Sequence, residues 1–208
     1  MTNITTLPNR HTSRIRPSHR HNMLLLDHWR QLHENHSMPA RQHLDLRVMA
    51  PALAHVGLVE KRDGKHVWRL AGSALCSTPQ GELTGREVLA GWQRFERQTL
   101  TRLFDRISGN GRPAIVRMSF NNGGYNGEML ILPLLDAATG EMLLMISIIP
   151  MHHPDDLRYI DLPGAELTAV RILPLPPAAI ATARQQAEAA APPPANRRGP
   201  FTVIEGGQ

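Results

Sequence analysis

The sequence predicts an α+β protein built on an antiparallel sheet. Two observations predict this class. Apolar residues recur at helical spacing in residues 23–35 and 89–108, and runs rich in Val, Ile, Leu and Met lie at 56–71 and 114–151. The turns inside each run are too short for a crossover, so neighbouring strands must be antiparallel. A chain of 208 residues has room for one such domain with tails.

The first element is a helix over residues 23–35. Its apolar stripe is formed by Leu25, Leu26, Trp29 and Leu32 at steps of three and four. The predicted order of elements offers this stripe no helical partner, so we interpret it as a dimerising or partner-docking face. The alternative is a cap that lies on the protein's own sheet. Pro39 follows and ends the helical pattern.

The next element is a β-hairpin. Two runs rich in Val and Leu flank Asp63-Gly64, and this pair supplies the positive φ angles of a tight type I′ turn. A long amphipathic helix follows over residues 89–108, and Gly109, Gly111 and Pro113 end it. Its apolar positions are Trp92, Phe95, Leu100, Leu103, Phe104 and Ile107.

Three further strands close the sheet, in "AIVRMSF", "YNGEMLILPLL" and "EMLLMISIIPM". The first alternates between apolar and polar residues. The other two are nearly continuous apolar runs, which predicts that both of their faces are covered or that they lie in the centre of the sheet.

The two ends differ from the middle. Residues 1–22 form a basic arm with four arginines and no acid, which could attract phosphate or anionic lipid or could simply be a solvated, disordered arm. Residues 152–208 are interpreted as a Pro- and Ala-rich tail. The tail ends in "FTVIEGGQ", whose Phe201, Val203 and Ile204 predict a tethered docking motif; the alternative is a disordered end with chance apolar residues.

Composition restricts the location of the protein. Cys76 is the only cysteine, so a disulfide framework is excluded and a reducing compartment is favoured. The N-terminus lacks a secretory pattern, and the longest apolar run, residues 142–151, is far shorter than the roughly 20 residues of a membrane span. We therefore expect a soluble, cytoplasmic protein.

Three segments resemble one protein family. They are "MPARQHLDL" at 38–46, "WRLAGSALCSTPQGELTGREV" at 68–88 and "GEMLILPLLD" at 127–136, and they occur in the family's order. The chain over residues 23–151 resembles a stand-alone bacterial PAS domain with an additional N-terminal helix.

The resemblance implies a five-stranded antiparallel sheet of order 2-1-5-4-3 with the helices over one face. It also implies a module that binds small ligands between sheet and helices, or docks partner proteins, without catalysis of its own. The long helix faces a sheet rich in Met and Leu, so we predict a ligand pocket there, and the alternative is that the same residues only fill the core. The predicted pocket residues are Leu70, Trp92, Phe95, Phe104, Met118, Leu132 and Met145.

Other chemistries find little support in the sequence. Cys76 lacks the sequence context of a flavin-adduct cysteine, and the long helix contains no histidine that could bind haem. His33 and His36 have metal-ligand spacing, but a third convergent ligand is not evident. The motifs of hydrolases, phosphate-binding loops and dinucleotide-binding folds are missing. We expect no cofactor, no metal and no enzymatic activity.

The sequence therefore predicts a sensory or adaptor PAS domain in bacterial signal transduction. It would bind a small-molecule ligand, or a regulatory protein or kinase, and form a homodimer. The alternative is a nucleic-acid-associated regulator that uses the basic arm, and a third class is a small enzyme on a PAS-like fold.

Overall fold

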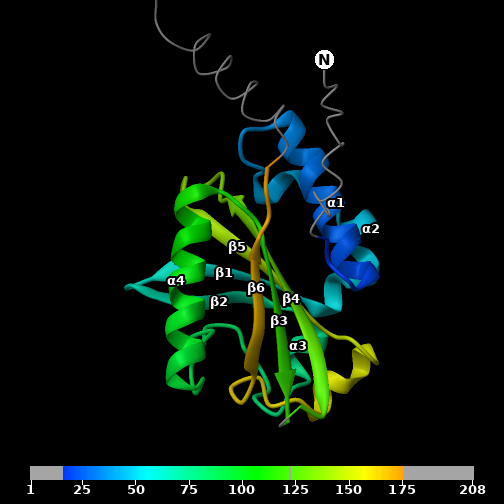
Figure 1. Ribbon diagram of the computed structural model, residues 1–208. Helices are drawn as coiled ribbons and strands as arrows, with labels where there is room; N and C mark the ends of the chain where they lie inside the picture. Colours follow the sequence, from blue (N-terminus) through cyan, green and yellow to red (C-terminus); the bar gives the residue numbers. More distant parts are fainter. Residues whose placement is uncertain (1–15, 122, 176–208) are drawn as a thin grey trace, which may run out of the picture.

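The computed structural model describes residues 16–121 and 123–175, which fold into three layers (Figure 1). A sheet forms the middle layer. Helix α4 (Arg94–Asn110) covers one face, and helix α1 (Arg20–Asn35) lies on the other. Short helices accompany α1, namely η1 (Arg41–His43), α2 (Leu46–Met49) and η2 (Ala50–His55).

The described residues form a six-stranded antiparallel sheet of order β2-β1-β5-β4-β3-β6. The first five strands have the predicted order. They are β1 (Val56–Arg62), β2 (Lys65–Ala71), β3 (Ala114–Phe120), β4 (Tyr125–Leu135) and β5 (Met142–Pro150). The β1–β2 turn has positive φ at Asp63 (49°) and Gly64 (75°), as a type I′ hairpin requires.

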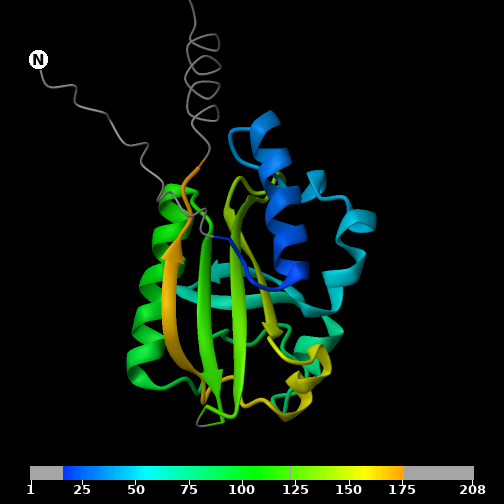
Figure 2. The same ribbon diagram turned by 45° about the vertical axis from the view of Figure 1, so that its right-hand side comes forward.

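The sixth strand corrects the prediction of a tail that starts at residue 152. Strand β6 (Glu166–Ile172) pairs antiparallel with β3, beyond the short helix η3 (Pro154–Tyr159). Its Leu167, Val170 and Ile172 pack against the core below α4. The sequence analysis missed this short strand because a proline-rich sequence follows it, although the strand contains β-branched residues. Figure 2 shows β6 beside β3 at the edge of the sheet.

The long helix starts later than predicted. Residues 89–91 form a turn, residues 92–93 have no regular secondary structure, and Gly91 has a φ of 78°, so the helical backbone begins only at Arg94. At the other end Gly111 caps α4 in the left-handed conformation, with a φ of 67°, as the glycine pattern predicted. The segment between β2 and α4 contains the short helix α3 (Ser73–Cys76).

Helices cover both faces of the sheet, because the additional N-terminal helix packs on the face opposite α4. Alternate residues of β4 and β5 point to opposite sides: Met129 and Ile131 pack in the core below α4, whereas Leu130 and Leu132 pack in the core below α1. We call these the inner core (α4 side) and the outer core (α1 side). The continuous apolar runs of β4 and β5 thus have both faces buried, as predicted.

Candidate functional site

The inner core contains only a small cavity at the place where a ligand pocket was predicted. Its volume is about 90 Å³, and Trp68, Leu83, Trp92, Met129 and Ile148 are among the residues that line it. Phe104 and Met118 also belong to this core and are fully buried. Three of the seven predicted pocket residues therefore lie on this side of the sheet, mainly as core.

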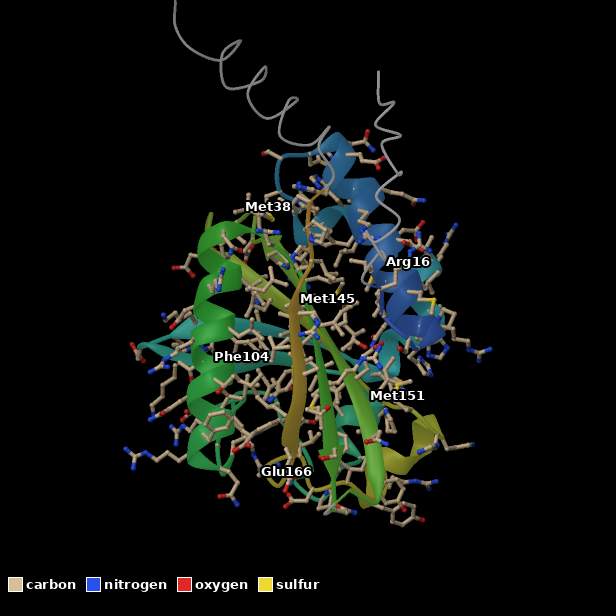
Figure 3. The ribbon with its side chains drawn as sticks, in the orientation of Figure 1. Arg16, Met38, Phe104, Met145, Met151 and Glu166 are labelled. Atoms are coloured by element: carbon tan, nitrogen blue, oxygen red, sulfur yellow. The ribbon has the colours of Figure 1, made fainter. Side chains whose placement is uncertain are left out.

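The other four predicted residues do not join them. Leu132 and Met145 point to the α1 face, Leu70 is 53 % exposed, and Phe95 is 70 % exposed on α4. For the three strand residues the physical reason is the two-residue period of a strand, which sends neighbouring residues to opposite faces. Phe95 lies on the exposed side of helix α4. The prediction that all seven line one pocket is wrong. Figure 3 labels Phe104 on α4 and Met145 on the sheet.

Helix α1 is part of the folded domain. Leu25, Leu26 and Trp29 are each 1 % exposed in the outer core, and the Trp29 indole Nε1 donates to the Pro133 carbonyl at 2.7 Å. Leu32 is half-buried. The premise that this stripe is exposed is wrong, because the stripe covers the sheet as the alternative reading proposed. The homodimer stays a prediction and needs another surface.

The start of α1 is attached to the sheet by Glu128, a residue that the sequence reasoning missed. The Glu128 side chain is 1 % exposed. Its carboxylate accepts from the backbone N–H groups of Ser18 (2.7 Å) and His19 (3.2 Å) and from the Asn22 side-chain amide (3.1 Å). The presence of a glutamate within an otherwise apolar strand was the sequence signal that could have indicated this buried contact.

One row of side chains on the α1 face leads from the buried sheet to solvent. In the strand registers Leu132 pairs with Met145, Met145 with Leu58, and Leu58 with Leu70. Exposure along this row rises from 1 % at Leu132 and Met145 to 6 % at Leu58 and 53 % at Leu70. Helix α1 covers the first part of the row, and the rest forms the floor of an open groove.

This outer groove has a volume of about 560 Å³, within the range of about 300–1,000 Å³ typical of small-molecule pockets. One wall comes from the segment between α1 and β1, where Leu46 is 60 % exposed. The apolar lining is Leu44, Leu46, Met49, Leu53, Val56, Leu58, Leu70, Ala137, Ala138 and Met145, and the polar lining is Arg41, Gln42 and Asp136.

Charged side chains form ion pairs at the rim of the outer groove. The Arg69 guanidinium donates to the Asp136 carboxylate and lies 3.8 Å from Glu60. The Arg69 hydrogen bond, the Ala138 N–H and the nearby Arg41 charge lower the pKa of Asp136 below its usual value. Asp136 therefore stays ionised, and Arg69 neutralises its charge.

The remaining chemical candidates lie apart from one another. Cys76 is half-buried, with its Sγ 3.7 Å from a Glu82 oxygen. His36 stacks on His43, and within residues 16–121 and 123–175 no group of three or more His, Cys, Asp or Glu side chains is arranged to hold a metal. Phe201, Val203, Ile204 and most of the basic arm lie outside the described residues.

The layered sheet, the β2-β1-β5-β4-β3 order and the helical segment between β2 and β3 define the fold as an α+β domain. The model of the PAS domain family matches residues 17–148, and the chain belongs to that family. Family membership indicates a sensory or signalling module, and PAS domains are common ligand-binding and protein-interaction modules. A search of curated proteins finds no match.

The helices of the described residues are also too short or too polar to cross a membrane.

Proposed function

We propose that this PAS domain is an adaptor that binds a partner signalling protein, a kinase or a regulator, in the outer groove and has no catalysis of its own. The observation that carries the proposal is the contrast between the two hollows. The outer groove measures about 560 Å³ and is open, whereas the inner cavity measures about 90 Å³.

The size of the inner cavity argues against an organic cofactor between sheet and α4. Pockets for such ligands usually measure about 300–1,000 Å³. Trp68 and Trp92 enter the inner core from opposite ends of the β2–α4 segment and are 3 % and 7 % exposed. Large side chains thus occupy the space that a cofactor would need, so recognition falls to the outer groove.

The outer groove suits an amphipathic segment of another protein. Leu46 on the wall and Leu70 on the floor are large apolar side chains more than half exposed, and burying them against a partner would be favourable. Arg41 lines the same groove, and the salt bridges within the described residues do not include it. The partner segment therefore carries apolar anchors and an acidic side chain that meets Arg41.

The test is retention of partner proteins from host lysate on the immobilised full chain. Leu70→Asp and Arg41→Glu should each remove a protein that the wild type retains. Phe95→Asp is the matched control, because it places the same charge on another exposed apolar residue, which lies on α4 and does not line the groove. A partner lost equally from Leu70→Asp and Phe95→Asp would contradict the proposal.

Native mass spectrometry of the purified chain separates the adaptor from a ligand sensor. If the protein is an adaptor, the measured mass should equal that of the chain or of its oligomer, with no added mass from a small molecule. A small molecule that stays bound to the wild type and is lost from Leu70→Asp would assign the groove to that ligand and overturn the protein partner.

A further inference from the structure

A second hollow lies on the α1 side of the sheet, over β3 and β6. Its volume is about 330 Å³, and its lining residues are Arg16, Ile115, Arg117, Ala169 and Arg171. Three arginines from three separate segments therefore line one space, which we call the arginine hollow. Helix α1 packs over β4, between this hollow and the outer groove over β1, β2 and β5. Figure 3 labels Arg16 on the same side of the molecule as α1.

The strand register explains why the hollow exists. Ile115 pairs with Arg171, and Arg117 pairs with Ala169, so all four side chains share one face. Arg117 and Arg171 are diagonal neighbours, which lie about 7–8 Å apart in an antiparallel pair. Ala169 is small and leaves open space opposite Arg117, while Ile115, 3 % exposed, forms an apolar floor.

The charges around the arginine hollow are only partly balanced. Arg117 donates to the Ser18 hydroxyl and lies 3.7 Å from the Glu128 carboxylate, which already accepts two backbone N–H groups. Arg171 donates to the Val170 carbonyl at 3.3 Å. Among the residues that the structure describes, the salt bridges include neither Arg16 nor Arg171. Two cations thus face the hollow without an anionic partner among the described residues.

We propose that the arginine hollow binds a small phosphate dianion or diphosphate. Guanidinium groups form paired, charge-assisted hydrogen bonds with phosphate oxygens, and a phosphate group has enough oxygens to accept from more than one arginine. An anion with two or more negative charges would match the two unpaired cations and relieve their mutual repulsion. The site is independent of the outer groove, so it adds a second binding function to that of the proposed adaptor.

Calorimetric titration of the full chain with inorganic pyrophosphate tests the site. The wild type should bind pyrophosphate more tightly than orthophosphate, and higher salt should weaken both. Arg171→Gln should weaken pyrophosphate binding about ten-fold, the effect of losing one charge-assisted contact. Arg106→Gln is the matched control, since it removes the same charge from α4 on the opposite face of the sheet.

Ala169→Leu separates a built site from general attraction to a basic protein. The larger side chain fills the space opposite Arg117 and leaves every arginine in place, so the proposal requires pyrophosphate binding to be lost. Unchanged binding in Ala169→Leu, or equal losses in Arg171→Gln and Arg106→Gln, would overturn the proposal. Circular dichroism of each variant verifies that it is folded.

Two additional titrations identify the ligand class. ADP carries the same diphosphate on a nucleoside: tighter binding of ADP than of pyrophosphate assigns a nucleotide, and equal affinity assigns the diphosphate alone. The absence of pyrophosphate binding at millimolar concentration would overturn the proposal. Binding of a short duplex DNA without binding of pyrophosphate would also overturn the proposal.

Discussion

At several positions the exposure of a residue differs from what its chemical type suggests. Leu70 and Phe95 looked like pocket residues in the sequence, yet they are 53 % and 70 % exposed. Apolar character alone does not reveal on which side of a strand or helix a residue lies. Glu128 shows the opposite case, since its charge suggests solvent but its carboxylate is buried below the start of α1. Both outcomes depend on tertiary partners that local sequence does not encode.

Glu128 is expected to stabilise the attachment of α1. Glu128→Ala removes the acceptor for Ser18 N–H and His19 N–H and should lower the free energy of unfolding by about 1–3 kcal/mol. Urea unfolding measures the loss. Glu34→Ala on the exposed side of α1 is the control and should change the midpoint little. Equal midpoints for the two variants would contradict the role of Glu128.

His66 should make stability depend on pH. Burial lowers its pKa below the ordinary 6.5, against smaller opposing effects of Asp105 and Glu87, and Lys61 lowers it further. The folded state therefore disfavours the protonated ring. The stability that neutral His66 contributes is complete above the pKa of His66 in the unfolded chain, near 6.5. This stability is lost as pH falls towards the lower pKa of His66 in the folded protein.

His66→Gln should thus reduce the stability lost between about pH 7 and pH 5. His19, His21 and His33 have pKa values lowered mainly by burial as well, so part of the pH dependence should remain. Urea midpoints at both pH values measure the change, with His152→Gln, an exposed residue, as the control. A pH dependence identical to that of the wild type would exclude His66 as a contributor.

At the scale of elements, the sequence pattern predicted which helices and strands exist better than it predicted where they pack. The Asp63-Gly64 hairpin and the glycine end of α4 followed from local backbone preferences, which act over a few residues. Strand β6 was missed because its pairing with β3 joins segments about fifty residues apart. Helix α1 was found, but its place on the sheet depends on the outer core and could not be read from the helix alone.

Helix α1 is expected to be essential to the fold. Trp29→Ala removes a side chain that is 1 % exposed and hydrogen-bonded to Pro133, and it should lower the free energy of unfolding by about 3–5 kcal/mol. Phe95→Ala, 70 % exposed on α4, should change it by less than about 0.5 kcal/mol. Urea unfolding compares the two. A small effect of Trp29→Ala would show that α1 is only loosely attached.

At the scale of the whole molecule, the sheet is a layer shared by two cores. The continuous apolar runs of β4 and β5 predicted that both faces are covered, and the family resemblance supplied the strand order. What covers the second face could not be predicted, because a helix with one apolar stripe suits a partner protein as well as its own sheet. The outer groove is the part of that face that α1 leaves uncovered.

The shared sheet should make the two cores unfold together. The three tryptophans report on them separately, because Trp29 lies in the outer core and Trp68 and Trp92 lie in the inner core. Trp29→Phe leaves the inner reporters, and the double change Trp68→Phe with Trp92→Phe leaves the outer one. Within each variant, tryptophan fluorescence and far-ultraviolet circular dichroism should give one common urea midpoint. A fluorescence transition of Trp29 that precedes the loss of secondary structure would show that α1 detaches from the sheet as a separate unit.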